Sequence, residues 1–116
     1  MQLFVFVCSI AFASLTVTPK QMNVHPNQCV EIKVSFPESN HDNARRIVLS
    51  SNNPKVGVFV SRDCSGGAES TISSLKPDFY FTVQPAADIS PGTYSVVVNS
   101  TLNGDSQLGD FSLLVK

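Results

Sequence analysis

The side chains of this 116-residue chain that could bind a metal ion or activate water are few and widely spaced. His25 precedes a proline and His41 stands in a polar stretch, and neither has a second histidine at metal-ligand spacing. Asp105 and Asp110 offer carboxylate oxygens, which calcium prefers, but no recognised loop pattern surrounds them. We therefore predict surface histidines, no metal site and no cofactor.

Ser106 stands in a run that suggests nucleophilic catalysis, the sequence Gly-Asp-Ser-Gln-Leu at residues 104–108. The run resembles the nucleophile motif of GDSL-type esterases, which implies a larger α/β fold with a histidine and a second aspartate far downstream. Here eight residues follow Leu108 and none is a histidine, so no base can activate the hydroxyl in the expected order. A polar hairpin loop explains the run better, and we predict that the chain is not an enzyme.

The first thirteen residues have the pattern of an export signal. Residues 3–7 and 10–12 are apolar, and Ala11 and Ala13 place small side chains where a signal peptidase cuts. The run is too short to span a bilayer, although it lacks the usual Lys or Arg near its start. We predict a cleaved secretory signal peptide at residues 1–13 and one secreted, extracellular domain at residues 14–116. The alternative for the leader is a buried first strand.

Charge and length exclude several classes of partner. The formal net charge is −1 and no basic stripe is present, so nucleic acid is a poor partner. No second apolar run approaches the roughly twenty residues of a membrane helix, so we predict no membrane span. Residues 14–116 have the usual length of a single domain and are numerous enough to bury one hydrophobic core.

Cleavage of the predicted leader would remove Cys8 and leave two cysteines, Cys29 and Cys64. An even pair of cysteines in an exported chain predicts a disulfide. Closing a loop of that length would stabilise the fold by about 3–4 kcal/mol in the chain-entropy model. Two cysteines at this distance offer too few ligands for a metal ion.

Asn99 begins the N-glycosylation sequon Asn-Ser-Thr. It shares the outward face of its strand with Ser95, so a glycan would point away from the core. We predict glycosylation at Asn99 if the source is eukaryotic. The alternative is a polar residue at the end of a strand.

Apolar and polar residues alternate through most of the domain with the period of half-buried strands. Turn residues separate the runs, and Asn103-Gly104 suits a tight hairpin, so the last two strands should pair. No stretch shows a helical period over ten residues, which predicts an all-β, antiparallel sandwich or barrel of about seven strands. The alternating runs are residues 15–18, 30–36, 47–49, 56–60, 79–83, 94–99 and 111–115.

Residues 88–94, Asp-Ile-Ser-Pro-Gly-Thr-Tyr, and the strand after them resemble the approach to strand F of immunoglobulin-like domains. The opening at residues 15–19 and the close at residues 111–115 resemble the first and last strands of such domains. The resemblance covers nearly the whole mature chain and implies an immunoglobulin-like β-sandwich. In that fold the hydroxyl of Tyr94 would bond back to the backbone as a tyrosine corner.

Two features depart from antibody-type domains: Val96 stands where the second core cysteine would be, and the chain has no tryptophan. If Val30 and Ile32 point inward, Cys29 shares the outward face, while Cys64 falls in a Gly-rich loop. We therefore expect the bridge to pin a loop to the edge of the sandwich instead of crossing the core. This favours a generic immunoglobulin-like module over an antigen-receptor domain.

Four apolar residues fall between the inward positions of their strands: Val48, Phe59, Val97 and Leu114. By analogy with immunoglobulin-like order, their strands are C, C′, F and G, which lie side by side. Together they would form an exposed apolar stripe, and such stripes often mark partner surfaces. The alternative is scattered surface residues, which are normal, or a bulge that shifts the strand parity.

These observations favour a secreted, non-enzymatic binding or adhesion module that recognises an extracellular protein or glycan through its outer sheet face or loops. One alternative is an inhibitor of papain-like cysteine proteases, because residues 64–67, Cys-Ser-Gly-Gly, resemble the Gly-Gly loop of chagasin-like inhibitors. The family's Asn-Pro-Thr-Thr-Gly loop is reduced here to Asn53-Pro54, and Lys76-Pro77 precedes the wrong strand for its Arg-Pro-Trp loop. Another alternative is an extracellular structural protein that self-associates through the apolar stripe.

Overall fold

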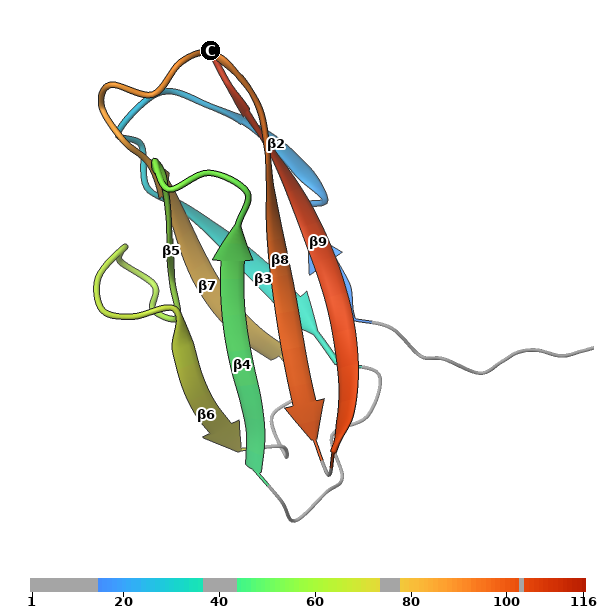
Figure 1. Ribbon diagram of the computed structural model, residues 1–116. Helices are drawn as coiled ribbons and strands as arrows, with labels where there is room; N and C mark the ends of the chain where they lie inside the picture. Colours follow the sequence, from blue (N-terminus) through green and yellow to red (C-terminus); the bar gives the residue numbers. More distant parts are fainter. Residues whose placement is uncertain (1–14, 37–43, 74–77, 103) are drawn as a thin grey trace, which may run out of the picture.

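The computed structural model describes residues 15–36, 44–73, 78–102 and 104–116 (Figure 1). Their regular secondary structure consists of strands, and none of them belongs to a helix with the length and apolarity needed to cross a bilayer. The predicted leader with Cys8, as well as His41, Lys76-Pro77 and Asn103, lies outside the described residues. The strands are β1 (Thr16–Thr18), β2 (Gln21–Val24), β3 (Val30–Ser35), β4 (Ala44–Ser51), β5 (Val56–Phe59), β6 (Glu69–Ser73), β7 (Asp78–Pro85), β8 (Gly92–Leu102) and β9 (Asp105–Val115).

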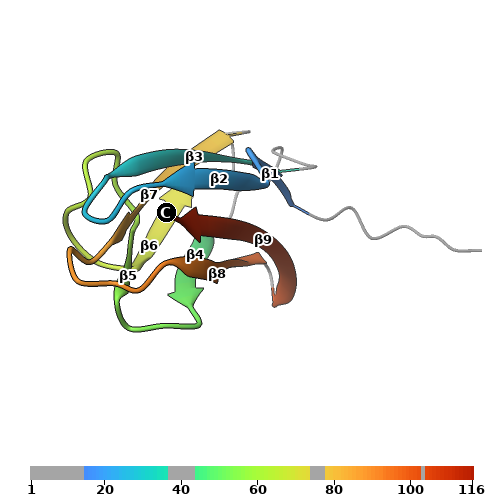
Figure 2. The same ribbon diagram turned by 90° about the horizontal axis from the view of Figure 1, so that it is seen from above.

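The strands form two sheets that face each other, as Figure 2 shows from above. One sheet has four strands in the order β1-β3-β7-β5, and the other has five in the order β2-β9-β8-β4-β6. Every pairing among the described strands is antiparallel except that of β2 with β9, which is parallel. The predicted all-β, immunoglobulin-like sandwich is confirmed, with nine described strands in place of about seven.

Two local features account for the extra strands. Pro19 has no N–H to donate to a ladder, and near it the chain leaves the four-stranded sheet as β1 and enters the five-stranded sheet as β2. Residues 69–73, where the sequence pattern is weak, pair with β4 at the edge of the five-stranded sheet.

The middle strands follow an order that differs from the expected one. β5 pairs with β7, with Val58 opposite Val83, and therefore belongs to the four-stranded sheet. β6 then returns to the five-stranded sheet and pairs with β4. The expected position of residues 56–60 beside the strand of Val48 was therefore wrong. Alternation shows which side chains share a face of a strand, but it does not show which sheet the strand joins.

The core lies between the sheets and consists of the alternating apolar side chains. In β3, for example, Val30 and Ile32 are buried while Glu31 between them is exposed. Each fully buried side chain of this size stabilises the fold by about 1.5–3 kcal/mol relative to its exposed state. The apolar side chains with no exposed surface are Ile32, Val34, Ile47, Phe81, Val83, Val96, Val98 and Leu113.

β8 and β9 form a long hairpin, with Leu102 opposite Asp105 at the turn and Gly92 opposite Val115 at the other end. The predicted pairing of the last two strands is confirmed. Gly104 in the turn has a φ of 84°, a left-handed conformation that glycine adopts without steric cost. Since β9 begins at Asp105, the run at residues 104–108 is a turn followed by the start of a strand.

Candidate interaction surface

The outer face of the five-stranded sheet, called here the five-stranded face, carries three of the four predicted interface residues. Val48 lies on β4, Val97 on β8 and Leu114 on β9, and all three side chains are half-buried. The strand register places Asn99 between Val48 and Leu108. Val97 is the diagonal neighbour of both Val48 and Leu108, a relation that keeps side chains within reach of each other. Leu114 lies further along β9, opposite Thr93.

Leu108 is the large apolar side chain that stands out from the described surface, with 58% of its area exposed. It sits on the same outer side of β9 as Leu114 and Asp110, because these positions are separated by multiples of two. The sequence interpretation assigned residues 104–108 to a loop and therefore missed Leu108. Counting back by twos from Leu114 would have found it.

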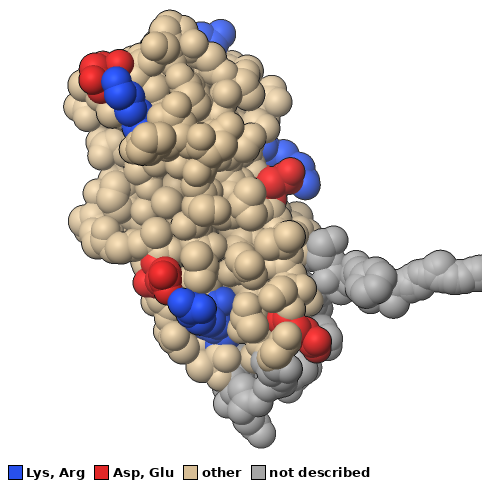
Figure 3. Space-filling view, viewed as in Figure 1, with Lys and Arg blue, Asp and Glu red and all other residues tan. Residues whose placement is uncertain are grey.

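Charged side chains lie around the rim of the five-stranded face and leave its centre uncharged (Figure 3). Arg46 pairs with Glu69 near one end, and Lys20 Nζ lies 3.9 Å from Asp110 Oδ1 beside β9. Towards the other end, Lys55 Nζ lies 3.0 Å from Asp88 Oδ2, and this hydrogen bond holds the pKa of Asp88 below its usual value. A partner docking on the uncharged centre would have few charges to desolvate, which lowers the cost of binding.

Asn99, the predicted glycosylation site, lies in the middle of the five-stranded face. Its Oδ1 is buried and accepts no hydrogen bond from any described residue. The Asn99 side chain is half-buried and belongs to the outward positions of β8, which alternate with the buried Val98 and Ser100. Nδ2 is the atom that an N-linked glycan would use, and the glycan would then extend over Val48 and Leu108, the cross-strand neighbours of Asn99.

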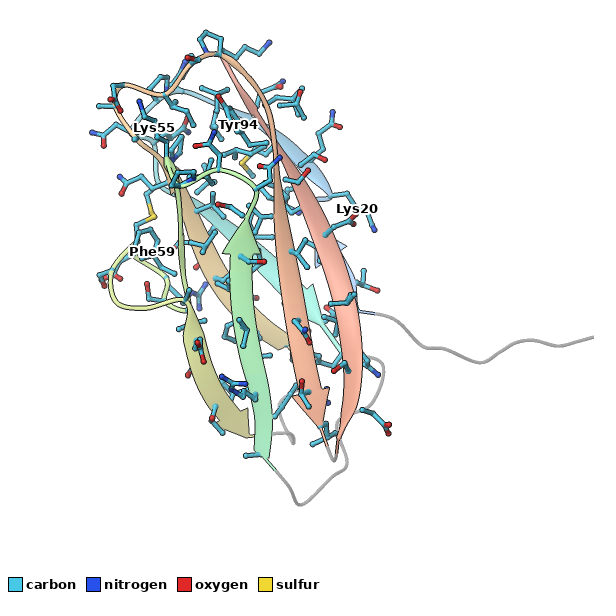
Figure 4. The ribbon with its side chains drawn as sticks, viewed as in Figure 1. Lys20, Lys55, Phe59 and Tyr94 are labelled. Carbon is cyan, nitrogen blue, oxygen red and sulfur yellow. A yellow bond between two sulfur atoms is a disulfide. The ribbon has the colours of Figure 1, made fainter. Side chains whose placement is uncertain are left out.

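Phe59, the fourth predicted interface residue, does not lie on the five-stranded face. It is opposite Thr82 of β7 in the four-stranded sheet, and Figure 4 shows it at the opposite lateral edge of the molecule from Lys20. Its ring packs over the backbone at Gly57, where an added Cβ would lie 2.9 Å from Phe59 Cζ. The placement of Phe59 with Val48 was therefore wrong, because the chain crosses to the other sheet directly after β4.

The predicted disulfide is confirmed and lies outside the core. Cys29 and Cys64 are bonded with a Cα–Cα distance of 6.1 Å, and Cys29 is exposed at the start of β3. The bond holds the loop at residues 60–68, called here the strap, against the outer side of the four-stranded sheet. The backbone N–H of Cys64 donates to Thr82 Oγ1 at 3.0 Å, and Thr82 is fully buried.

Non-covalent contacts of Arg62 hold the same strap. Its Nη2 donates to Glu31 Oε1 at 3.1 Å and its Nε donates to Oε2, while its guanidinium carbon lies 4.1 Å from the centre of the Tyr80 ring. The hydrogen bonds from Arg62 lower the pKa of the Glu31 carboxyl. The strap therefore covers part of the four-stranded sheet and brings charged groups onto it.

Tyr94 lies at the end of the sandwich near the C-terminus (Figure 4). Its hydroxyl donates to the backbone oxygen of Ser90 at 2.6 Å, the contact that defines a tyrosine corner. Beside it, Ser95 N–H donates to Asn52 Oδ1 at 3.1 Å. The bond from Ser95 ties the turn after β4 to the beginning of β8, and the bond from Tyr94 closes the segment that leads into β8.

The fragments that resemble protease-inhibitor loops lie in different parts of the molecule. Asn53-Pro54 follows β4 and lies near Ser95 at the beginning of β8. Residues 64–67 belong to the strap on the outer side of the four-stranded sheet. Lys76-Pro77, the third fragment, lies outside the described residues.

Arg45 is a buried residue that the sequence interpretation missed. It is 2% exposed, its Nη1 donates to Ser100 Oγ at 3.2 Å, and its guanidinium carbon lies 4.0 Å from the centre of the Phe36 ring. The signal was present in the parity of β4, because Arg45 precedes the inward residues Ile47 and Leu49 by even steps. Arg45 is part of the packing between the sheets and not of the outer surface.

The remaining candidates for chemistry are not brought together. Ser106 is at the beginning of β9, whereas His25 follows β2, whose last residue pairs with Val115 at the other end of β9. Asp105 and Asp110 are five positions apart on one extended strand, about 17 Å, too far to share an ion. No group of three or more potential metal-ligating side chains occurs among the described residues.

The chain matches no protein-family model and no curated protein sequence. Among solved structures it is similar to a conjugative transposon lipoprotein from Bacteroides eggerthii, with 14% sequence identity and a TM-score of 0.62 over 86% of this chain and 94% of that one. It is also similar to the swine CD8aa homodimer, with 8% identity and a TM-score of 0.51 over 88% of this chain and 97% of that one. At these identities the similarity shows the fold alone, a two-layer immunoglobulin-like sandwich.

Proposed function

We propose that the protein is a secreted, non-enzymatic binding module that recognises an extracellular partner through its five-stranded face. The observation that carries this proposal is the uncharged centre of that face, where Val48, Val97 and Leu108 surround Asn99 within a rim of ion pairs. An apolar or neutral centre with a polar rim is the common anatomy of protein interfaces.

The opposite side of the sandwich is a weaker candidate for the same role. The strap covers Thr82 there, and two ion pairs lie on the same side, with Lys33 Nζ 3.6 Å from Asp78 Oδ2 and Arg62 bonded to Glu31. A partner would have to desolvate these charges or displace a covalently tied loop.

Secretion and the lack of enzymatic activity rest on separate observations. The disulfide favours an oxidising compartment, and the apolar leader supplies a route to it. The described residues hold no nucleophile, base and metal set in mutual reach. Neither similar solved structure is described as an enzyme.

Glycosylation of Asn99 and binding at the five-stranded face exclude each other. A glycan on Nδ2 would lie over the neighbours Val48 and Leu108, because the register sets them on either side of Asn99. We therefore propose that molecules with an unmodified Asn99 bind the partner and that molecules glycosylated there do not. Thr101→Ala removes the sequon and leaves Asn99 unmodified, so this variant should bind the partner even when it is produced in cells that glycosylate the wild type.

The test compares capture of partners from native extracellular fluid by three immobilised proteins. Val48→Lys places a charge in the centre of the five-stranded face, and Thr16→Lys places the same charge at an exposed position of β1 in the other sheet. We expect wild type and T16K to retain the same partner and V48K to lose it, with circular dichroism and melting temperature confirming that both variants fold. Equal capture by V48K and T16K would reject the five-stranded face as the binding surface.

A further inference from the structure

β9 is paired along its whole length on one side and along less than half on the other. β8 pairs with all of β9, from Asp105 to Val115. On the other side, β2 pairs only from Ser112 to Val115, and the Ser112 N–H donates to Lys20 O at 2.9 Å where this pairing begins. Beyond that point, no strand among the described residues continues the sheet (Figure 1).

The unpaired part of β9 directs backbone hydrogen-bonding groups outward. In a strand, alternate residues present their N–H and C=O groups to the same side. Since Ser112 faces β2, Asp110, Leu108 and Ser106 present their backbone groups to the same, open side. Such an edge is a template for another strand, and natural proteins usually cover it or blunt it.

The side chains along this edge are suited to contact. Leu108, 58% exposed, stands at its centre. A shallow pocket of about 340 Å³ lies beside it, lined by Leu15, Lys20, Val97, Leu108, Gly109 and Asp110. An exposed leucine next to a partly apolar hollow gives both halves of a self-complementary contact.

We propose that this edge is occupied by a second copy of the chain, with the two β9 strands antiparallel about a two-fold axis at Leu108. Closed two-fold dimers use the same patch on both subunits, and two antiparallel strands allow the axis at an outward-facing residue or at the residue between two of them. An axis at Gly109 would limit the pairing to residues 107–111, because the Ser112 N–H is already bonded to Lys20 O, and an axis at Gln107 would limit it to residues 105–109, because Gly104 belongs to the turn. An axis at Asp110 would set two carboxylates directly opposite each other, which destabilises a strand pair. An axis at Ser106 would run the pairing past the turn at Gly104 and shorten it.

An axis at Leu108 keeps the two carboxylates apart and gives the longest pairing. It sets Leu108 against its own copy and Ser106 against Asp110 of the second copy, where a serine hydroxyl can donate to a carboxylate. All paired positions then fall within residues 105–111, the stretch that β2 leaves open. The result is one continuous sheet of two five-stranded halves.

This inference goes beyond the proposed function because it concerns strand pairing at the edge of the sheet. The two proposals share Leu108, whereas Val48 belongs to the outer face alone. A dimer could form whether or not the five-stranded face binds a partner, and V48K leaves the edge intact. The two proposals therefore fail independently.

Cysteine cross-linking of the full chain tests the register. Paired residues at a two-fold axis have Cα atoms about 5.5 Å apart, within disulfide range, so Leu108→Cys should give covalent dimers under mild oxidation. The matched variant Ser106→Cys should not, because the two copies of residue 106 would be about 14 Å apart along the strands. Wild-type protein should show a concentration-dependent monomer–dimer equilibrium in sedimentation velocity, and Leu108→Lys should be monomeric.

Each outcome decides the proposal. Cross-linking of L108C alone, together with a wild-type dimer that L108K abolishes, supports it. A wild type that stays monomeric at all accessible concentrations overturns it, as does a wild-type dimer in which S106C cross-links as readily as L108C. Melting curves of the three variants show whether each retains the fold.

Discussion

Replacing both bonded cysteines by alanine, C29A/C64A, should destabilise the fold by about 3.8 kcal/mol at 25 °C. The two cysteines are separated by 35 positions, and a loop of that size lowers the entropy of the unfolded chain by about 13 cal/mol/K in the chain-entropy model. Domains of this size have a total stability of about 5–15 kcal/mol, so the bond is a large part of what keeps the protein folded.

Urea denaturation of wild type and C29A/C64A, followed by far-ultraviolet circular dichroism, measures the difference directly. The melting temperature should fall by roughly 15–20 °C for a domain of about one hundred residues. Arg62→Ala is the matched control, since it removes the exposed contacts of the strap with Glu31 and Tyr80 but leaves the disulfide in place. We expect a much smaller decrease in R62A.

Two results would refute this reasoning. A loss below about 1 kcal/mol in C29A/C64A would mean that the bond hardly restricts the unfolded chain. A larger loss in R62A than in C29A/C64A would mean that non-covalent contacts, and not the disulfide, hold the strap on the four-stranded sheet.

Three further perturbations follow from single contacts. Tyr94→Phe removes the hydrogen bond to Ser90 O and should cost about 0.5–1.5 kcal/mol in urea titration; an unchanged midpoint would show that the tyrosine corner does not stabilise the fold. Gly109→Ala sets a Cβ 2.8 Å from Val17 Cγ2 and 3.2 Å from Leu15 Cβ, so it should lose about 1–3 kcal/mol, whereas Gly67→Ala meets nothing within 4 Å and should melt like wild type. Hydrogen bonds from Arg62 and Lys55 lower the pKa values of Glu31 and Asp88 in the folded state. Both carboxylates therefore stabilise the fold above their unfolded pKa values, and this contribution is lost as the pH falls through the lower folded pKa values. The melting temperature should fall below about pH 4, and the decrease should be smaller in the double variant E31Q/D88N.

Alternation predicted the core positions and an all-β fold, and the resemblance to immunoglobulin-like domains added the two-layer sandwich. The inward positions of β3, β7, β8 and β9 are those that the sequence pattern marks, because burial between two sheets selects every second side chain. Parity also predicted that Cys29 would face outward, so the disulfide could be placed outside the core.

The order of β5 and β6 could not be predicted in the same way. Residues 56–60 alternate and residues 69–73 do so only weakly, but either strand could extend either sheet, since pairing with β7 or with β4 depends on long-range packing. The analogy with immunoglobulin-like order therefore misplaced Phe59, and with it one quarter of the predicted stripe.

Arg45 and Leu108 were missed because residue type was weighed above position. A charged side chain is almost never fully buried unless it is paired, so the polar stretch before Ile47 was taken as surface. Leu108 lies among polar residues at the beginning of β9, where the pattern resembled a loop. In both cases the parity of the adjoining strand indicated the correct side of the sheet.

The most direct test of the five-stranded face is the methyl NMR spectrum of the protein with and without its captured partner. If the partner binds the five-stranded face, the methyl signals of Val48, Val97 and Leu108 should shift or broaden, and the signal of Val60 in the strap should not change. Changes confined to Val60 and its surroundings, with Val48 and Val97 unaffected, would contradict this prediction.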